Sequence, residues 1–164
     1  MLCNHGVCFA AGSLITSRDM LPGLNYLTIS IDKFGIKDPQ YYLDPYISVS
    51  VKNFHGDDIE VSQDTPLANQ KEGSHIQFGV SVLIRSPLEE LPEGAAIFFE
   101  FKHYKPNKKR VSTKCFSFME MDEIKPGKAA LEIYKKPTDF HRKKLSLLSA
   151  KPLYLQLTLN IHKS

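Results

Sequence analysis

The 164-residue sequence predicts an all-β fold, an eight-stranded antiparallel β-sandwich. Apolar and polar residues alternate with a period of two in five runs, as strands do when they bury one face. Turn-forming glycine, proline, asparagine and aspartate separate the runs, and no stretch of 12 residues shows helical periodicity. Short strands separated by turns of this kind favour a sandwich.

The strands are expected at regular intervals along the chain. The five runs that share the alternation cover residues 27–32, 47–52, 76–82, 97–102 and 153–162. Shorter strands are expected at 113–119 and 129–134. Pro45 and Pro152 stand at strand starts, where a missing N–H group is tolerated. The segment 139–148 is compatible with a short helix that carries Lys and Arg on one side.

Composition and charge restrict the class of protein. Hydrophobic residues make up 42% and charged residues 24%, as in globular chains, and no run of 18 apolar residues predicts a transmembrane helix. Residues 1–100 hold 6 Lys/Arg and 13 Asp/Glu, whereas residues 101–164 hold 15 and 5. This asymmetry predicts an anionic partner, either lipid headgroup, nucleic acid or acidic protein. A solvated surface whose charges interleave after folding explains it equally well.

The first 25 residues differ from the rest of the chain. They lack helix or strand periodicity, so we expect a poorly ordered segment or linker at 1–25, followed by one domain at 26–164. The apolar stretch 7–15 has no Lys or Arg before it, which argues against a secretory signal.

The three cysteines have no framework spacing, which argues against a disulfide scaffold and favours a reducing, cytoplasmic location. Cys3, His5 and Cys8 lack a second ligand pair, so no zinc site is expected there. Cys115 is expected to be a small buried hydrophobe.

Catalysis finds little support in the sequence. It contains no Gly-x-Ser-x-Gly, no His-Glu-x-x-His, no phosphate-binding glycine loop and no paired carboxylates with flanking structure. The six histidines lack ligand spacing. His103 falls on the face of Phe99 and Phe101, which favours a packing role over a catalytic one. We therefore expect no enzyme, no metal and no cofactor.

Three loops are candidates for a binding site, because loops gather at the two ends of a sandwich. The first, 33–44, leads into an Asp44-Pro45-Tyr46 step. It is consistent with a calcium-binding or membrane-contacting loop. A structural turn, in which Asp44 caps, Pro45 blocks further pairing and Tyr46 anchors the strand, is the alternative.

The second loop, 104–110, is the most basic, and the stretch 101–119 holds six Lys/Arg, one His and no acid. Each base near an anionic membrane contributes about 1 kcal/mol, so the loop predicts a weak, salt-sensitive attachment. A solubilising hairpin tip is the alternative.

The third loop, 135–144, surrounds one acid with five bases. A second basic patch is expected at Lys135, Lys136, Arg142, Lys143 and Lys144. It either extends the same surface that binds an anionic partner, forms a separate protein-binding patch, or is a charged connector over the edge of the sandwich.

The order of elements resembles a known family. The run 27–31, a loop with Asp38 and the step 44–49 resemble the opening of a C2 domain, and 97–104 resembles the strand that leads into its third loop. The final strand follows the last loop, which indicates the type II arrangement. The strings 94–106, 112–116, 118–127 and 134–140 resemble the C-terminal domain of the axin interactor, dorsalization-associated protein family.

This resemblance implies a C2 sandwich that binds membrane lipid, notably phosphoinositide. It also implies an adaptor that binds the scaffold axin and restrains axin-driven Jun N-terminal kinase signalling in embryonic dorsoventral patterning. Calcium-binding C2 domains supply carboxylates from the first and third loops, because Ca²⁺ takes six to eight oxygen ligands. Asp38 and Asp44 are available in the first loop, but Lys102, His103 and Lys105 occupy third-loop positions. We therefore expect calcium-independent binding.

The predicted function is a non-enzymatic module with peripheral association to anionic membranes. The lipid contacts are expected at Lys33, Lys37, Lys102, His103, Lys105, Lys108, Lys109 and Arg110. The alternative is a protein–protein module whose basic patches bind an acidic partner segment. Nucleic acid is not expected, because only Tyr104 offers an aromatic platform beside the bases.

Overall fold

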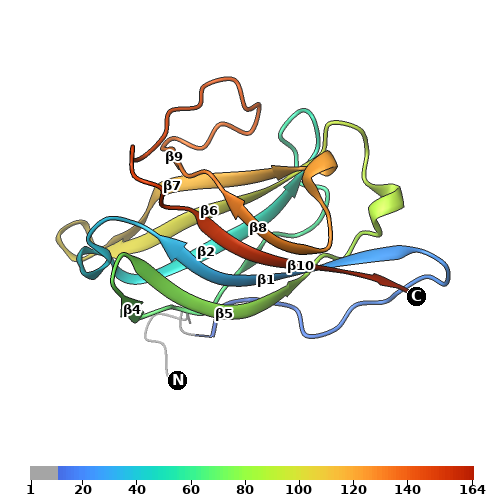
Figure 1. Ribbon diagram of the computed structural model, residues 1–164, viewed down its shortest axis with the longest axis horizontal. Helices are drawn as coiled ribbons and strands as arrows, with labels where there is room; N and C mark the ends of the chain where they lie inside the picture. The colour runs from blue at the N-terminus through green and yellow to red at the C-terminus, as the bar shows by residue number, and fades with distance from the viewer. Residues whose placement is uncertain (1–10) are drawn as a thin grey trace.

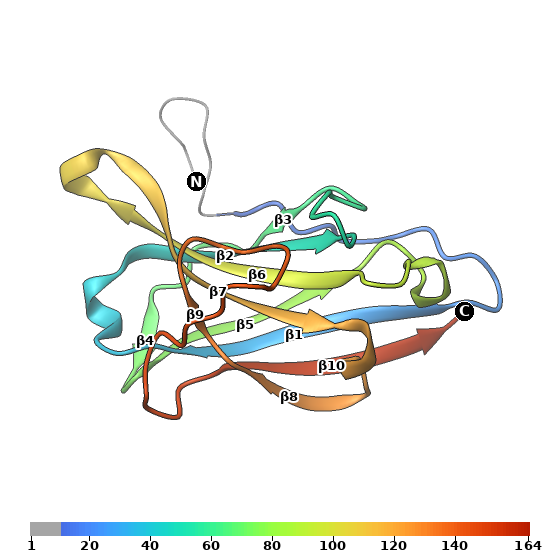
Figure 2. The same cartoon turned by 90° about the horizontal axis from the view of Figure 1, so that it is seen from above.

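The computed structural model describes residues 11–164, and the Cys3, His5 and Cys8 group lies outside them. Two antiparallel sheets of five strands face each other (Figures 1 and 2). The first sheet has the order β4 (Gln70–Glu72), β5 (His75–Leu83), β1 (Asn25–Gly35), β10 (Leu155–Lys163) and β8 (Gly127–Leu131). The second has the order β3 (Gln63–Asp64), β2 (Leu43–Lys52), β6 (Ala96–Lys105), β7 (Arg110–Glu120) and β9 (Tyr134–Lys135).

The predicted β-sandwich is confirmed. Each of the seven expected runs coincides with one of the seven strands of five or more residues, and the first and last strands, β1 and β10, are paired neighbours. The difference is in β3, β4 and β9, which have two or three residues each. Strands this short contain too few residues to show an alternating pattern. No helix in residues 11–164 is long and apolar enough to cross a membrane.

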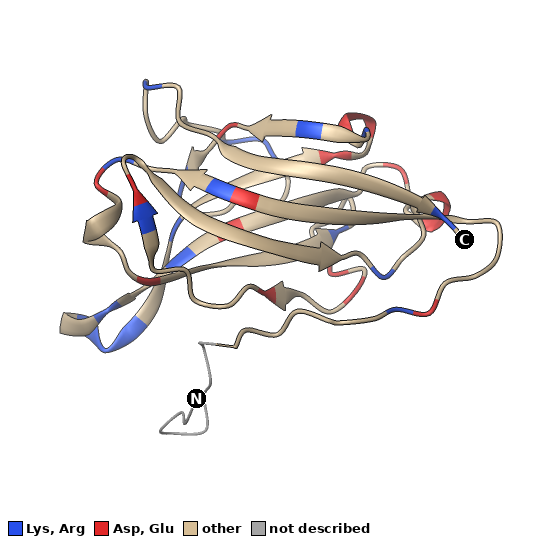
Figure 3. Cartoon of the chain, turned by 60° about the horizontal axis from the view of Figure 1, so that its bottom comes forward, with Lys and Arg blue, Asp and Glu red and all other residues tan. Residues whose placement is uncertain are grey.

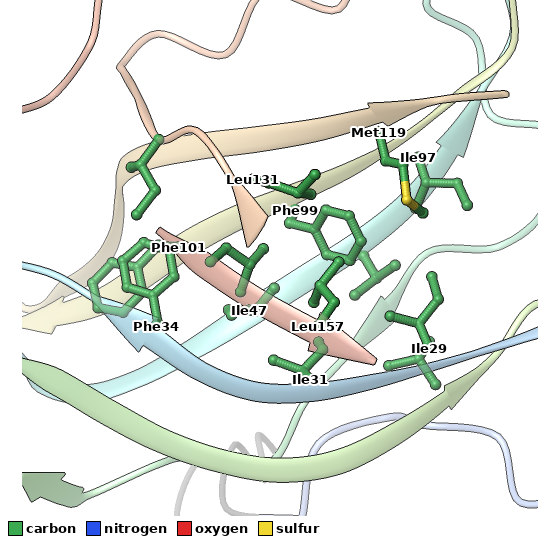
Figure 4. Close-up of a cluster of buried hydrophobic side chains, with 14 of the residues drawn as sticks. Ile29, Ile31, Phe34, Ile47, Ile97, Phe99, Phe101, Met119, Leu131 and Leu157 are labelled. Carbon is green, nitrogen blue, oxygen red and sulfur yellow. The ribbon is translucent and has the colours of Figure 1, made fainter. Parts of the chain in front are cut away.

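The core lies between the two sheets and is built from the alternating apolar positions of both (Figure 4). Ile29 and Ile31 of β1 face Phe99 of β6, and all three are 1% exposed or less. Phe34 of β1 stacks on Phe101 of β6 with ring centroids 4.5 Å apart and an interplanar angle of 9°. The two sheets are therefore joined by an aromatic contact near the end of the sandwich where β1 and β6 finish.

Four connections meet at that end. Strands β1 and β6 end there, and β5, β7 and β10 begin there. The connections at this end are therefore 36–42, 73–74, 106–109 and the approach to β10 at 149–154. The Gly35 N–H donates to the Tyr154 carbonyl (2.9 Å). The Ile36 N–H donates to the Ser74 carbonyl (2.9 Å). These bonds hold segments that are far apart in sequence at one end of the fold.

The segment 139–148 is not a helix, so the sequence expectation was wrong there. The Asp139 carboxylate accepts the backbone N–H groups of His141 (3.0 Å), Lys143 (2.9 Å) and Lys144 (2.7 Å). Arg142 has a positive φ of 59°, which a helix does not accommodate. Aspartate competes for nearby backbone donors in this way, and a turn forms instead of a helix.

Residues 11–24 lie against the sandwich, whereas the sequence predicts a poorly ordered segment at 1–25. The Ser13 N–H donates to the Asp64 carbonyl (2.8 Å). The Arg18 guanidinium donates to the carbonyls of Leu27 (2.6 Å) and Ile84 (2.8 Å) and to the Thr28 hydroxyl (3.2 Å). Hydrogen bonds to backbone groups produce no periodic pattern of side chains, so the sequence did not predict this attachment.

Replacing Arg18 with alanine is expected to lower the free energy of unfolding by about 1–3 kcal/mol, because three acceptors lose a charged donor. Urea unfolding of the Arg18→Ala variant measures the loss. Arg85→Ala is the matched control, since Arg85 is exposed and its side chain donates no hydrogen bond within residues 11–164. Equal stabilities of the two variants would contradict an anchoring role for Arg18.

Candidate functional site

The basic hairpin is the most prominent charged feature of the fold. Strands β6 and β7 are joined by a 3₁₀ turn at Pro106–Lys108, and Lys109 follows it with a positive φ of 51°. Lys108, Lys109 and Arg110 are exposed. Figure 3 shows Lys and Arg along this tip at the left end, while Asp and Glu occupy short turns at the opposite end. The β6–β7 tip is therefore basic, although acids such as Asp38 and Glu72 lie in or beside other connections at the same end.

The cations around the hairpin repel one another. The pKa of Lys105 is lowered by Lys136 above all, then by partial burial and by Lys108, Arg110 and Lys114. Neither ion pair of residues 11–164, which join Lys52 to Asp58 and Arg142 to Glu120, involves these bases. We call this group the basic rim: Lys105, Lys108, Lys109, Arg110, Lys114 and Lys136.

Two members of the basic rim were not predicted as part of the hairpin site. The register between β6 and β7 shifts from Phe101↔Cys115 to Lys102↔Thr113, which leaves Lys114 in a β-bulge. Bulges re-aim side chains, and Lys114 lines a pocket at the basic end. Lys136 comes from the third loop, since β9 pairs with β7 and directs the chain toward the start of β7. The acid-free stretch that contains Lys114 was the only sequence signal for it.

His103 does not belong to the exposed site, contrary to the prediction of a lipid contact there. It is 3% exposed, and its ring meets the edge of Tyr42 with centroids 4.9 Å apart. Burial first, and then Lys105, Lys114 and Lys136, lower the pKa of His103 to about 4. The imidazole is therefore neutral at pH 7 and extends the core beneath the basic rim.

The other three residues predicted to contact lipid, Lys33, Lys37 and Lys102, do not lie together in the fold. Lys37 is exposed and lines the same pocket as Lys114, so the structure brings it to the basic end. Lys33 pairs with Gln77 and Gln156 and lies with Lys128 along a shallow hollow on the first sheet, apart from the hairpin. Lys102 is half-buried in β6, on the face opposite to Phe101.

Exposed apolar side chains accompany the cations at this end. Tyr41 is 75% exposed and Leu43 is 44% exposed. Leu43 is the register partner of Tyr104 near the end of β6, so it lies beside the basic hairpin. An open pocket of about 460 Å³ separates the β1–β2 connection from residues 148–153. The basic end thus combines cations that form no ion pair within residues 11–164 with apolar tips.

The two first-loop aspartates do not form a carboxylate cluster. Asp44 accepts a hydrogen bond from the Asn69 amide (3.1 Å), and both Asp38 and Asp44 have positive φ angles. Within residues 11–164, no three His, Cys, Asp or Glu side chains lie close enough together to hold a metal ion. Third-loop positions carry Lys102, His103 and Lys105.

The third loop forms a second basic feature, but Arg142 is not part of its surface. The Arg142 side chain is only 12% exposed. It donates to the Gly94 carbonyl (3.0 Å) and lies 3.4 Å from a Glu120 carboxylate oxygen. Its prediction as a patch residue is corrected, since it anchors the loop to the turn before β6 and to the end of β7. Lys135, Lys143 and Lys144 are exposed.

Comparison with known proteins identifies relatives over most of the chain. The family model described as "Axin interactor dorsalisation-associated protein, C-terminal" matches residues 14–159. Axin interactor, dorsalization-associated protein from Danio rerio is 59% identical over 152 residues, which cover 93% of this chain and 50% of that protein. The Homo sapiens protein is 55% identical with the same coverage. The chain spans about half the length of these curated relatives.

A solved structure has a similar fold. A C2 domain of plant Extended Synaptotagmin 1 superposes with a TM-score of 0.57 and 12% sequence identity, covering 88% of this chain and 98% of that one. The similarity supports the C2-like architecture that the sequence predicts.

Burial of neutral His103 predicts a stability that depends on pH. Because its pKa is lowered from 6.5 to about 4, the unfolded chain binds a proton that the folded chain does not accept. The contribution is complete above pH 6.5 and is lost as the pH falls toward 4, by about 2 kcal/mol at pH 5.

Urea unfolding at pH 5 and pH 7.5 measures this dependence. The His103→Gln variant should show a smaller difference between the two pH values, whatever its absolute stability. An unchanged pH dependence in the variant would assign the effect to another group.

Proposed function

We propose that this chain, which belongs to the axin interactor, dorsalization-associated protein family and represents its C-terminal domain, is a non-enzymatic C2-like module that attaches reversibly to anionic membranes. Phosphoinositide-containing membranes are the preferred target, and the basic rim is the contact surface. The observation that carries the proposal is a group of cations at one end of the fold, without carboxylate partners within residues 11–164. Inositol phosphate headgroups supply the missing negative charge.

The basic rim has a charge suited to weak attachment. Six bases at about 1 kcal/mol each contribute at most about 6 kcal/mol. Five of the six bases stand on the β6–β7 hairpin, so little ordering is needed when they meet a charged surface. Screening with a Debye length of about 8 Å makes this attraction sensitive to salt. Attachment of this strength is reversible and favours a regulated contact over a permanent anchor.

Apolar side chains at the same end favour a membrane over a flat acidic protein surface. Tyr41 and Leu43 project beside the basic rim. Tyrosine is enriched at the boundary between headgroups and hydrocarbon, because its ring is apolar and its hydroxyl is polar. Shallow insertion of Tyr41 and Leu43 would add an apolar contribution to the electrostatic attachment.

We further propose that attachment is independent of calcium. Two carboxylates, Asp38 and Asp44, supply too few ligands for an ion that takes six to eight oxygens. The lysines of the basic rim also repel a cation at this end. Bound calcium is therefore not needed to bridge protein and lipid, since the basic rim itself provides the positive charge.

The relatives are named for an interaction with axin, and the family resemblance adds restraint of axin-driven Jun N-terminal kinase signalling. We propose that this chain serves that adaptor as its membrane-contacting half. In this arrangement the domain would hold an axin-binding protein at a membrane on the cytoplasmic side. The charge of the basic rim would set how long the adaptor remains there.

Neutralising four bases of the basic rim is expected to weaken attachment strongly. The quadruple variant Lys105→Ala, Lys108→Ala, Lys109→Ala and Arg110→Ala should weaken vesicle binding by up to about 4 kcal/mol, roughly a thousandfold. Sedimentation with vesicles of phosphatidylcholine that contain phosphatidylinositol phosphate measures the change.

The matched control removes the same charge elsewhere on the surface. Lys125, Lys128, Lys151 and Lys163 are exposed and outside the basic rim, so their quadruple alanine variant should lose much less affinity. Equal losses for the two variants would indicate a dependence on net charge rather than on the basic rim. Undiminished binding by the rim variant would refute the assignment.

Calcium should not alter the attachment. Vesicle binding is expected to be the same in the presence of calcium and of a chelator, because two carboxylates do not complete a calcium site. Isothermal titration calorimetry of the protein with calcium should show no heat of binding at micromolar concentrations. Micromolar binding, or binding to vesicles only with calcium, would overturn this part of the proposal.

A further inference from the structure

The third loop folds into a hollow lined by basic side chains. Residues 135–146 enclose about 560 Å³ of open space. We call this feature the cradle, lined by Lys135, Lys136, Pro137, Thr138, Asp139, His141, Lys143, Lys144 and Ser146. The lining holds four lysines and one carboxylate, Asp139, which already accepts three backbone N–H groups. A second carboxylate, Glu100, accepts a hydrogen bond from the lining residue Thr138 (2.7 Å). The cradle therefore has a strong excess of positive charge.

The backbone of the cradle is held in place before any ligand binds. At its base, the Lys135 N–H donates to the Ser146 carbonyl (2.7 Å) and the Leu148 N–H donates to the Ile133 carbonyl (2.9 Å). At its far side, the Phe140 ring meets Phe98 with centroids 4.9 Å apart. Buried Arg142 ties the same loop to the Gly94 carbonyl. A loop anchored at several points loses little entropy when it binds a ligand.

The lysine ammonium groups of the cradle are unpaired within residues 11–164. None of them forms a hydrogen bond or an ion pair with another described residue. Lysine donates three hydrogen bonds and binds phosphate as a point charge. A phosphate monoester carries a charge of about −1.5 to −2 and three acceptor oxygens, so it matches several lysines better than one carboxylate does.

The cradle shares Lys136 with the basic rim, but the rest of the loop lies away from the β6–β7 tip. In Figure 1 the loop rises above β9 and β7, while the β6–β7 tip lies at the left end, and Figure 2 also separates the two. A membrane placed against the basic rim would leave the cradle open to solution. Leu145 and Leu147, 39% and 50% exposed, stand beside the charged side chains. These two leucines are available to contact side chains that flank a phosphate in a peptide.

We propose that the cradle binds a phosphorylated peptide segment of a protein partner, with the phosphate among Lys135, Lys143 and Lys144 and apolar side chains on Leu145 and Leu147. The choice of a peptide over a lipid rests in part on the proposed membrane contact at the basic rim. The cradle itself does not depend on that contact. Through this second site, the domain would hold a phosphorylated partner while the basic rim faces a membrane.

Fluorescence anisotropy tests the proposal with a labelled seven-residue peptide that has one phosphoserine between two leucines and glycine elsewhere. The Lys143→Ala/Lys144→Ala variant should bind it at least roughly tenfold more weakly than the natural protein. Lys143→Arg/Lys144→Arg should retain binding. The rim variant Lys108→Ala/Lys109→Ala should bind the peptide within about twofold of the natural protein.

Three outcomes would overturn the proposal. They are equal binding of the same peptide with unmodified serine, absence of binding by the phosphopeptide, and equal weakening by the cradle and rim variants. Thermal unfolding of the cradle variant controls for its fold, which should be retained because both side chains are exposed and unpaired within the part of the chain that the structure describes.

A second arm uses vesicles of phosphatidylcholine with phosphatidylinositol phosphate. The cradle variant should sediment with them like the natural protein. Loss of vesicle binding in the cradle variant would assign the cradle to the membrane surface and overturn the peptide proposal. A rim variant with intact vesicle binding would instead contradict the proposed function and leave the peptide result standing, so the two failures are distinguishable.

Discussion

An aromatic contact between the two sheets holds the basic end together. Phe34 of β1 stacks on Phe101 of β6, and the Tyr42 ring makes T-shaped contacts with both Phe101 and His103. This packing continues the core to the point where the loops emerge. The β1–β2 connection and the β6–β7 hairpin are therefore held by one buried cluster.

The same packing explains why a histidine lies among lysines without adding charge. His103 is buried against Tyr42, and nearby Lys105 and Lys114 further disfavour its protonated form. His103 therefore adds no positive charge at pH 7, and its ring packs in the core below the lysines instead. The lysines above remain solvated and lose little by standing close together, because water screens their repulsion. Buried neutral groups and exposed charged groups in adjacent layers produce a surface that is rigid and strongly basic.

Two basic features with different surroundings are a further consequence of the topology. The basic rim is flanked by Tyr41 and Leu43, whereas the cradle is an open hollow in one loop whose backbone is held by hydrogen bonds. Lys136 lies between them, since it lines the cradle and also lowers the pKa of Lys105. We interpret the rim as suited to a broad charged surface and the cradle as suited to one compact anion. Under the two proposals, one domain would contact a membrane and a protein together.

Local patterns in the chain were enough to place the strands and the basic hairpin, because alternation and turn composition are properties of neighbouring residues. The long runs of β1, β6 and β10 and the acid-free tip between β6 and β7 were all predictable in this way. Which bases share a surface became clear only after the chain was folded. Pairing of β9 with β7 brings Lys136 to Lys105, a bulge re-aims Lys114, and packing withdraws His103 and Arg142. These placements depend on strand register and on burial between segments distant in the chain, and local sequence patterns determine neither.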